Sequence, residues 1–312
     1  MVKEAIRVMI PSLLDLSKIT SMGVINITPD SFSDGGRFNT VSTFTQRVDA
    51  LINSGAAMID VGAQSTAPSS EPISAKIELQ RLEEILISYL ESNDWPAQTV
   101  LSIDTFRPDT FVTLYRKISE INSTIQLAWN DISGILDQRL AEVLLKDAPN
   151  CYYILGHSGV TDREDSANHL NYLVESKDMF LTVSDHFKSA RSFFNQHGVE
   201  SRVIYDPCLG FSKSYHANWQ LIDGMEQLLQ VIAPSPLLMG LSRKSFLRER
   251  LVPVVGPRDV SRKELIELSE YLHFSIISGW SNRCDSFAAP LILRVHQPFL
   301  VNIATSFGDY SK

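Results

Sequence analysis

Cysteine is scarce in this sequence, and its placement excludes two common kinds of small protein. The 312 residues include only three cysteines, Cys151, Cys208 and Cys284, which lie far apart and form no CxxC pair. An odd number of isolated cysteines supports neither a disulfide framework nor a structural zinc site. We therefore expect reduced, buried thiols.

Long apolar runs and an excess of basic residues are also missing. No stretch of about 18 apolar residues suggests a membrane span, and Lys3, Glu4 and Arg7 interrupt the amino terminus where a secretory signal needs an apolar block. A net charge of −8 argues against a nucleic-acid surface, because phosphate backbones attract an excess of Lys and Arg. These absences predict a cytoplasmic protein that binds neither membranes nor nucleic acid.

What is present is an alternation of short apolar runs with longer amphipathic segments, which is typical of βα units. The length suits one (β/α)8 TIM barrel, so we expect a single domain over 1–312 with an N-terminal extension over about 1–18. The expected strands are Met22–Ile27, Met58–Gly62, Thr99–Asp104, Thr124–Asn130, Tyr152–Leu155, Val203–Asp206, Leu237–Leu241 and Leu291–His296. The expected helices are Ser42–Asn53, Ile77–Leu90, Pro108–Ile118, Leu136–Leu145, Asp178–Asn195, Trp219–Val231 and Lys263–Ile277. The stretches Ser158–Lys177 and Arg248–Arg262 are polar or contain proline, and we expect long inserted loops there.

Polar residues recur where the expected strands end. They are Asn26, Asp60, Asp104, Asn130, His157, Asp206, Ser242–Lys244 and Arg294–His296. In a (β/α)8 barrel the carboxyl ends of the strands meet at one mouth, which holds the active site. Taken singly, Asp60 and Ser242 are expected to be helix caps or satisfied polar groups, but the recurrence indicates a site.

One group of these residues suits recognition of a flat heterocycle. Asp104, Asn130, Asp206 and Lys244 combine carboxylates, an amide and an ammonium, which can read N–H donors on one edge of a ring and a carbonyl or ring nitrogen on another. Asp206 could accept two parallel N–H donors. The neighbouring Asp131 is expected to cap a helix.

A second group suits an anion. Arg294 offers a planar fork of donors for phosphate, His296 can add another donor, and the oxygen of Asn26 can hold a hard cation such as Mg²⁺. Together they suggest a diphosphate bound with its metal.

Familiar motifs for other chemistry are incomplete or missing. The segment GHSGV at 156–160 lacks the second glycine of a GxSxG nucleophile elbow. No GxxxxGK[ST] and no GxGxxG occurs, so ATP and NAD lose their main support.

The segment Met22–Gly36, which reads MGVINITPDSFSDGG, closely matches the first signature of dihydropteroate synthases. Further matches follow in family order along nearly the whole chain. They are Ile59–Gly62, Ser65–Thr66, Pro68, Ser102–Thr105, Asn130–Gly134, Asp206–Pro207, Gly210–Phe211, Lys213, Ser242–Phe246 and Arg294–His296. The sequence therefore resembles the dihydropteroate synthase family, and the resemblance also implies the (β/α)8 fold.

The resemblance implies a transferase that condenses 6-hydroxymethyl-7,8-dihydropterin diphosphate with para-aminobenzoate in folate synthesis, giving 7,8-dihydropteroate and diphosphate. By similarity, the pterin would be held by Asp104, Asn130, Asp206, Lys244 and Phe211. The diphosphate and Mg²⁺ would be held by Asn26, Arg294 and His296, which with Lys244 form the expected catalytic set. Residues near para-aminobenzoate would be Thr66, Pro68 and Ser245. The family often forms homodimers and is a sulfonamide target, although the sequence reveals neither property.

Some positions depart from the family pattern. Ala67 replaces an arginine that is expected to contact diphosphate, for which Arg37 is a nearby candidate substitute, and His157 is displaced by one position. Cys208 replaces a glycine. These departures leave two alternatives open: a pterin-binding relative with lost or altered catalysis, and a barrel of the pterin-dependent methyltransferase type.

Overall fold

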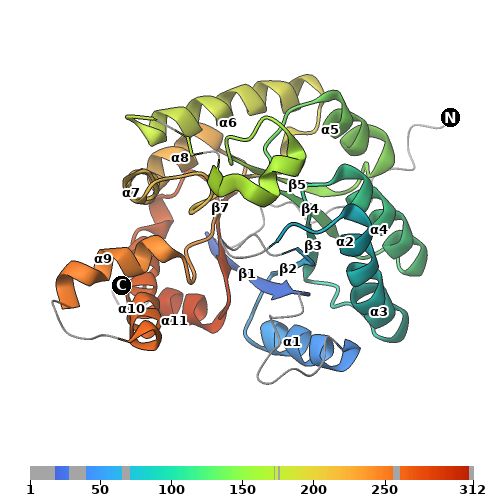
Figure 1. Ribbon diagram of the computed structural model, residues 1–312, viewed down its shortest axis with the longest axis horizontal. Coiled ribbons are helices and arrows are strands. Elements are labelled where there is room, and N and C mark those ends of the chain that lie inside the picture. Colours follow the sequence, from blue (N-terminus) through green and yellow to red (C-terminus); the bar gives the residue numbers. More distant parts are fainter. Residues whose placement is uncertain are drawn as a thin grey trace.

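Eight parallel strands close into a barrel in sequence order, β1 to β8, in the computed structural model of this chain. Helices surround the strands on the outside (Figure 1). The structure describes residues 18–27, 40–64, 71–171, 173–174, 176–255 and 261–308. The expected (β/α)8 barrel is confirmed, and nearly all of the expected N-terminal extension lies outside the described residues.

The strands fall within a few residues of their expected positions. They are β1 Ile19–Asn26, β2 Met58–Gly62, β3 Val100–Asp104, β4 Leu127–Asp131, β5 Tyr152–Gly156, β6 Val203–Asp206, β7 Leu237–Met239 and β8 Leu291–Val295. Each apolar run is short and is followed by a polar or glycine residue, which limits the strand and starts the connection to the next helix.

The outer layer consists of helices, and several of the described ones begin at a side-chain cap. The main ones are α1 Val41–Asn53, α2 Ala75–Leu82, α3 Ser88–Ser92, α4 Pro108–Ile121, α5 Gln138–Glu142, α6 Met179–Gln196, α7 Tyr215–Asp223, α8 Met225–Ile232, α9 Ser245–Val255, α10 Arg262–Ser281 and α11 Phe299–Gly308. Capping oxygens come from Thr40, Ser74, Asp137, Asp178, Ser214 and Ser261. These side chains satisfy backbone N–H groups that the first turn leaves unpaired. None of the described helices is long and apolar enough to cross a membrane.

Two expectations about the helices were wrong. The supposed loop Arg248–Arg262 is helical as far as Val255, because Phe246 and Leu247 bury the first turn of α9 and Pro253 removes a hydrogen-bond donor only near its end. The expected continuous helix Trp219–Val231 is two helices, α7 and α8, that meet at Gly224. The stretch Ser158–Lys177 contains a short 3₁₀ segment, η4 Arg163–Asn171.

The strands alternate between two apolar layers. Residues that face the helices join the large outer core, whereas residues of the other parity fill the inside of the barrel. The inner layer is Met22, Met58, Val100, Ala128, Tyr152, Ile154, Ile204, Leu238 and Ile292. Residues two positions further along each strand again point into the barrel, nearer the carboxyl end of that strand.

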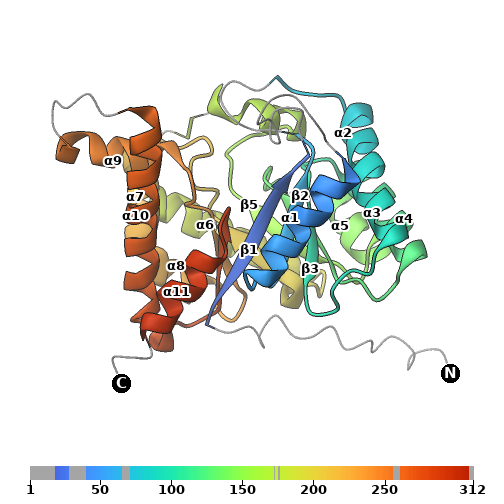
Figure 2. The same cartoon turned by 90° about the horizontal axis from the view of Figure 1, so that it is seen from below.

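That end of the barrel is the mouth. Figure 2 shows β1 running toward the end where α9 lies. The parallel register places Asn26 beside Gly62 and Gly62 beside Asp104, so the ends of β1, β2 and β3 are level.

Candidate active site

A polar layer lies directly above the inner apolar layer. In five strands, the residue two positions beyond an inner apolar residue is polar and also points into the barrel. These residues are Asp60, Ser102, Asn130, Asp206 and Arg294. Asn26 and Asp104 follow at the next inward level. The alternation of the strands thus explains why polar residues far apart in the sequence meet at one mouth.

Asp60 is the centre of this layer, although the sequence suggested only a cap or a satisfied polar group. Its carboxylate is fully buried. Ser102 donates to Oδ1 at 2.7 Å, and Asn130 Nδ2 donates to Oδ2 at 3.0 Å. Arg294 approaches Oδ2 with Nε at 2.8 Å and Nη2 at 2.7 Å. The carboxylate of Asp60 therefore has hydrogen-bond partners, as expected, but those partners are themselves residues of the site.

This arrangement decides which atom Asn130 presents to a ligand. A carboxylate only accepts hydrogen bonds, so the amide nitrogen of Asn130 must face Asp60 and its oxygen must face away. Asn130 therefore offers an acceptor to the mouth of the barrel.

Asp104 lies against Arg294, with Oδ2 3.0 Å from Nη2. Gly62 makes room for it, because a Cβ on that glycine would come within 3.1 Å of the Asp104 Cβ. Burial, and then the charge of Asp60, raise the pKa of Asp104 to about 7, while Arg294 opposes the shift. Asp104 is thus poised to gain or lose a proton near neutral pH.

Asp206 and Lys244 form the opposite side of the mouth. Burial raises the pKa of Asp206 to about 6, and burial followed by the charge of Arg294 lowers the pKa of Lys244 to about 8. One oxygen of Asp206 already accepts from the Cys208 N–H at 2.7 Å. We therefore expect a ligand to contact the other oxygen of Asp206, rather than both oxygens as the sequence suggested.

Phe211 is brought to this side by the connection after β6. Lys213 is buried and donates to the carbonyl oxygens of His157 and Phe211 at 2.6 and 3.0 Å, which fixes the loop. Lys244 Nζ lies 4.2 Å from the centre of the Phe211 ring, a cation–π contact. Phe211 and Lys244 therefore lie together on one wall of the mouth.

His296 marks a cationic corner of the site. Its Nδ1 lies 3.0 Å from Ser242 Oγ, so Ser242, like Asp60, is satisfied by a member of the site. Burial and the charges of Arg243, Arg294, Arg47 and Lys244 lower the pKa of His296 to about 3. The imidazole is neutral at ordinary pH, and the positive charge of this corner comes from its neighbours.

Asn26 ends β1 at the mouth and is only partly buried. Among the described residues no group of three or more His, Cys, Asp or Glu side chains could hold a metal ion. An amide oxygen beside a bound diphosphate nevertheless fits Mg²⁺, which usually takes one or two protein ligands together with substrate phosphates and water. The donor set is compatible with a metal that arrives with the substrate.

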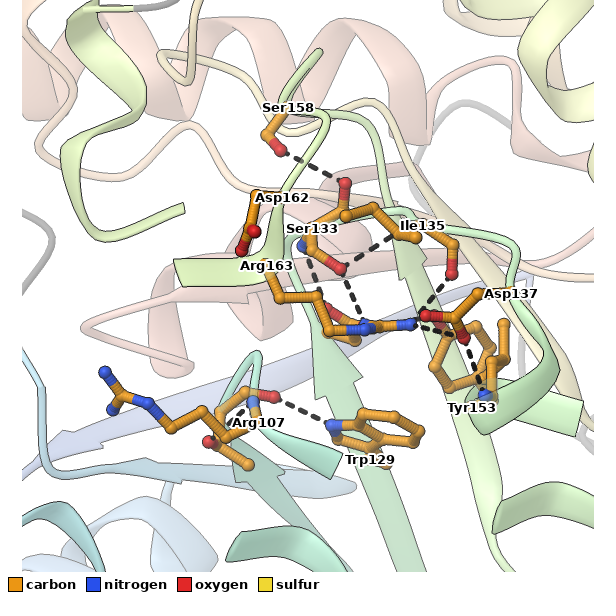
Figure 3. Close-up of polar contacts among 12 residues, drawn as sticks. Arg107, Trp129, Ser133, Ile135, Asp137, Tyr153, Ser158, Asp162 and Arg163 are labelled. Atoms are coloured by element: carbon orange, nitrogen blue, oxygen red, sulfur yellow. Dashed lines mark hydrogen bonds and ion pairs between the residues drawn. The ribbon is translucent and has the colours of Figure 1, made fainter. Parts of the chain in front are cut away.

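Asp131 does not cap a helix, contrary to expectation. Its Oδ1 accepts from the Ser133 N–H at 2.9 Å, and its Oδ2 accepts from the Tyr153 hydroxyl and from Arg163 Nη1. Figure 3 shows Arg163 reaching from the segment after β5 to Ser133, Ile135 and Asp137. The α5 cap is Asp137. Asp131 is therefore a structural anchor that joins the connections after β4 and β5.

The remaining expected site residues are placed differently. Ser245 is exposed at the start of α9, on the same connection as Lys244. His157 is buried with its ring against His186, 5.0 Å between ring centres. Thr66 and Pro68, together with Ala67 and Arg37, lie outside the described residues.

Sequence reasoning undervalued one functional candidate, Asp60, and missed another, Arg47. Asp60 has the same parity as Asp104 and could have been found from the alternation of β2 alone. Arg47 lies on α1, far from any motif, and only the fold brings it to His296, whose carbonyl oxygen it contacts at 2.7 Å. No local pattern marked it.

Fold and site together define a (β/α)8 barrel whose mouth presents acceptors and an ammonium to a flat ring, next to a corner suited to an anion. The sequence family described as "Pterin binding enzyme" matches residues 22–272. The chain belongs to this pterin-binding enzyme family.

Individual relatives agree with the family. The "Folate synthesis bifunctional protein" of Arabidopsis thaliana is 32% identical over 246 residues, which cover 75% of this chain and 48% of that protein. The chain thus spans about half the length of that relative. A dihydropteroate synthase of Clostridium beijerinckii is 32% identical over 231 residues, covering 72% of this chain and 75% of the relative.

A solved structure supports the fold. Xanthomonas albilineans dihydropteroate synthase with 4-aminobenzoic acid superposes with a TM-score of 0.69 at 24% identity, covering 96% of this chain and 94% of that one.

Proposed function

We propose that this chain is a dihydropteroate synthase, which joins 6-hydroxymethyl-7,8-dihydropterin diphosphate to para-aminobenzoate. The observation that carries the proposal is the pairing at one mouth of a ring-reading set, Asp104, Asn130, Asp206 and Lys244, with the cationic corner around His296. Dihydropteroate synthases from several organisms are among its relatives.

In this proposal the carboxylates and the Asn130 oxygen accept from the N–H groups of the pterin, and Lys244 donates to its ring acceptors. The bond between the pterin methylene carbon and the diphosphate oxygen breaks, and its electron pair leaves with the diphosphate. Arg294 and the neighbouring cations stabilise the charge that develops on the leaving group. The pterin ring delocalises the positive charge left on carbon.

The amine of para-aminobenzoate then supplies its lone pair to form the new carbon–nitrogen bond and releases a proton to solvent. A strong protein base is unnecessary, which agrees with the absence of a nucleophile and base pair among the described residues of the site. Mg²⁺, held by Asn26 and the diphosphate, would neutralise part of the phosphate charge. Chelation of Mg²⁺ is expected to abolish turnover while leaving pterin binding intact.

The test is product formation by the purified full chain. With dihydropterin diphosphate, Mg²⁺ and labelled para-aminobenzoate, the label should appear in dihydropteroate, and omission of either substrate should prevent it. Pterin binding without product would refute the synthase and favour a relative that has lost catalysis.

The same proposal extends to the wider setting of the protein. A dihydropteroate synthase of this kind would act in the cytoplasm as a homodimer on small-molecule substrates, without nucleic-acid or membrane partners. It would also be a sulfonamide target, since sulfonamides resemble para-aminobenzoate. Inhibition of turnover by a sulfonamide, relieved by added para-aminobenzoate, would test the last point.

A further inference from the structure

Arg47 brings an additional cation to the mouth of the barrel from outside every recognised motif. It lies on the second turn of α1, and its Nη2 donates to the carbonyl oxygen of His296 at 2.7 Å. That bond uses one of its five N–H donors. Among the described residues, no carboxylate lies within 4.0 Å of Arg47 or of its neighbour Arg243.

The other arginine of this corner is already balanced by acids. Arg294 places Nε and Nη2 on Asp60, and Nη2 also on Asp104. Two carboxylates therefore offset its charge before a ligand arrives. Only its Nη1 end is left to face an anion.

No acid of the described ranges offsets Arg47 or Arg243 in this way. Burial, and then the charge of Arg243, lower the pKa of Arg47. After burial, the charges of Arg243 and Arg47, together with those of Arg294 and Lys244, also lower the pKa of His296. Arg243 is held in this position with a left-handed backbone, φ 62°, which is unusual for a residue with a side chain.

Like charges that are held together without acids favour a bound anion. We propose that Arg47 binds the diphosphate group of the substrate and, with Arg243, supplies the positive charge that Ala67 does not. The inference rests on the proposed function, since it assigns the group that this corner takes. A diphosphate carries several negative charges, which matches two guanidinium groups that no described carboxylate pairs with, beside one arginine balanced by acids.

A purely structural role is the competing explanation. The bond to His296 ties α1 to the connection after β8, and loss of that bond could loosen the fold without touching a ligand. The variant Arg47→Gln separates the two roles, because glutamine retains an N–H donor but no charge. Arg47→Lys is the complementary variant, because it retains a charge but no planar fork.

Arg191→Gln provides a matched control. Arg191 is also a partly buried helical arginine that donates to backbone carbonyl oxygens, those of Val231 and Ala233 at 3.1 and 2.6 Å. It lies on α6 and contacts the segment that leads into β7, at the opposite end of the barrel from the mouth.

The experiment measures binding of inorganic pyrophosphate with Mg²⁺ and, separately, of 6-hydroxymethylpterin by calorimetry. Arg47→Gln should weaken pyrophosphate binding about ten- to a hundredfold and leave 6-hydroxymethylpterin binding unchanged. Arg47→Lys should keep most of the pyrophosphate affinity, and Arg191→Gln should change neither ligand.

Several results would overturn the inference. They are unchanged pyrophosphate binding in Arg47→Gln, equal loss of both ligands in that variant, and equal loss of pyrophosphate binding in folded Arg47→Lys and Arg47→Gln. Lack of pyrophosphate binding by the unaltered chain would also overturn it. If Arg47→Gln does not fold, Arg47→Lys decides: retained pyrophosphate affinity supports the inference, and loss contradicts it. Product formation is a separate readout, so pyrophosphate binding that depends on Arg47 without dihydropteroate would refute only the synthase.

Discussion

At the scale of single residues, burial moves the pKa values of three members of the ring-reading set, Asp104, Asp206 and Lys244, toward neutral pH. Burial raises the pKa of Asp104 to about 7 and of Asp206 to about 6, and lowers that of Lys244 to about 8. The carboxylates accept from a ligand only when ionised, so affinity should fall as the pH drops through the pKa of Asp104 and then of Asp206. The ammonium donates only when charged, so affinity should fall again as the pH rises through the pKa of Lys244.

Binding of 6-hydroxymethylpterin should therefore be strongest between about pH 7, the pKa of Asp104, and about pH 8, the pKa of Lys244. Calorimetric titration across the acid and alkaline range measures this. A flat profile would contradict the assignment of these residues to the ring.

Asp60 should contribute as much to pterin binding as the residues that touch the ligand. Replacement Asp60→Asn removes the charge that Arg294 contacts and places an amide where Asn130 and Ser102 need an acceptor. We expect pterin binding to weaken by about tenfold or more, since hydrogen bonds to charged groups contribute about 1.5–3 kcal/mol. The acid limb of the pH profile should also move to lower pH, because Asp60 helps to raise the pKa of Asp104.

Ser102→Ala is the control, because it removes one bond to Asp60 but leaves those to Asn130 and Arg294. A folded Asp60→Asn protein with the affinity and pH profile of the unaltered chain would show that Asp60 has no part in positioning the site.

The sequence placed the ring-reading set at the mouth because Asp104, Asn130 and Asp206 lie at the ends of expected strands and Lys244 lies on the connection after β7. It undervalued Asp60, which sits within β2 and looks like an ordinary buried polar group until its partners are known. It could not predict Arg47, because the contact with His296 joins residues 249 positions apart. Such a contact depends on closure of the barrel rather than on any local pattern.

At the scale of elements, Arg163 joins the connections after β4 and β5. It contacts Asp131, Ser133, the Ile135 carbonyl oxygen and Asp137 (Figure 3). Asp131 is fully buried, and Arg163→Ala would leave its charge without an ionic partner. We expect a loss of about 3–5 kcal/mol in the free energy of unfolding, measured by urea denaturation.

The exposed arginine Arg116, which pairs with Asp147, is the control. Its replacement by alanine should cost no more than about 1 kcal/mol. Equal effects of the two substitutions would contradict a special role for Arg163.

Elements with a clear period were predicted well, and those that depend on packing were not. The strands were found because each apolar run ends at a polar residue or a glycine. The carboxyl half of α9 was missed because Pro253 suggests a break, whereas burial of Phe246 and Leu247 anchors the helix from its other end. The division between α7 and α8 at Gly224 likewise left no mark in the apolar pattern.

At the scale of the whole molecule, we expect two chains to associate. Sedimentation equilibrium should give roughly twice the chain mass of 35.0 kDa. A mass of one chain at micromolar concentration would contradict the dimer without bearing on the chemistry of the mouth.

The barrel places the ring-reading set and the cationic corner around His296 side by side at one mouth. Its strands deliver the ring-reading residues through their inward parity, while the ends of β7 and β8 and the helix α1 deliver the cations around His296.

The most direct test of the account is the ratio of the two products in a single reaction. With dihydropterin diphosphate, Mg²⁺ and para-aminobenzoate, the account predicts equal amounts of dihydropteroate and diphosphate, and no appreciable diphosphate when para-aminobenzoate is omitted. Rapid diphosphate release without para-aminobenzoate would indicate hydrolysis. No release of diphosphate despite pterin binding would indicate a protein that binds the pterin without acting on it, and either result would contradict the account.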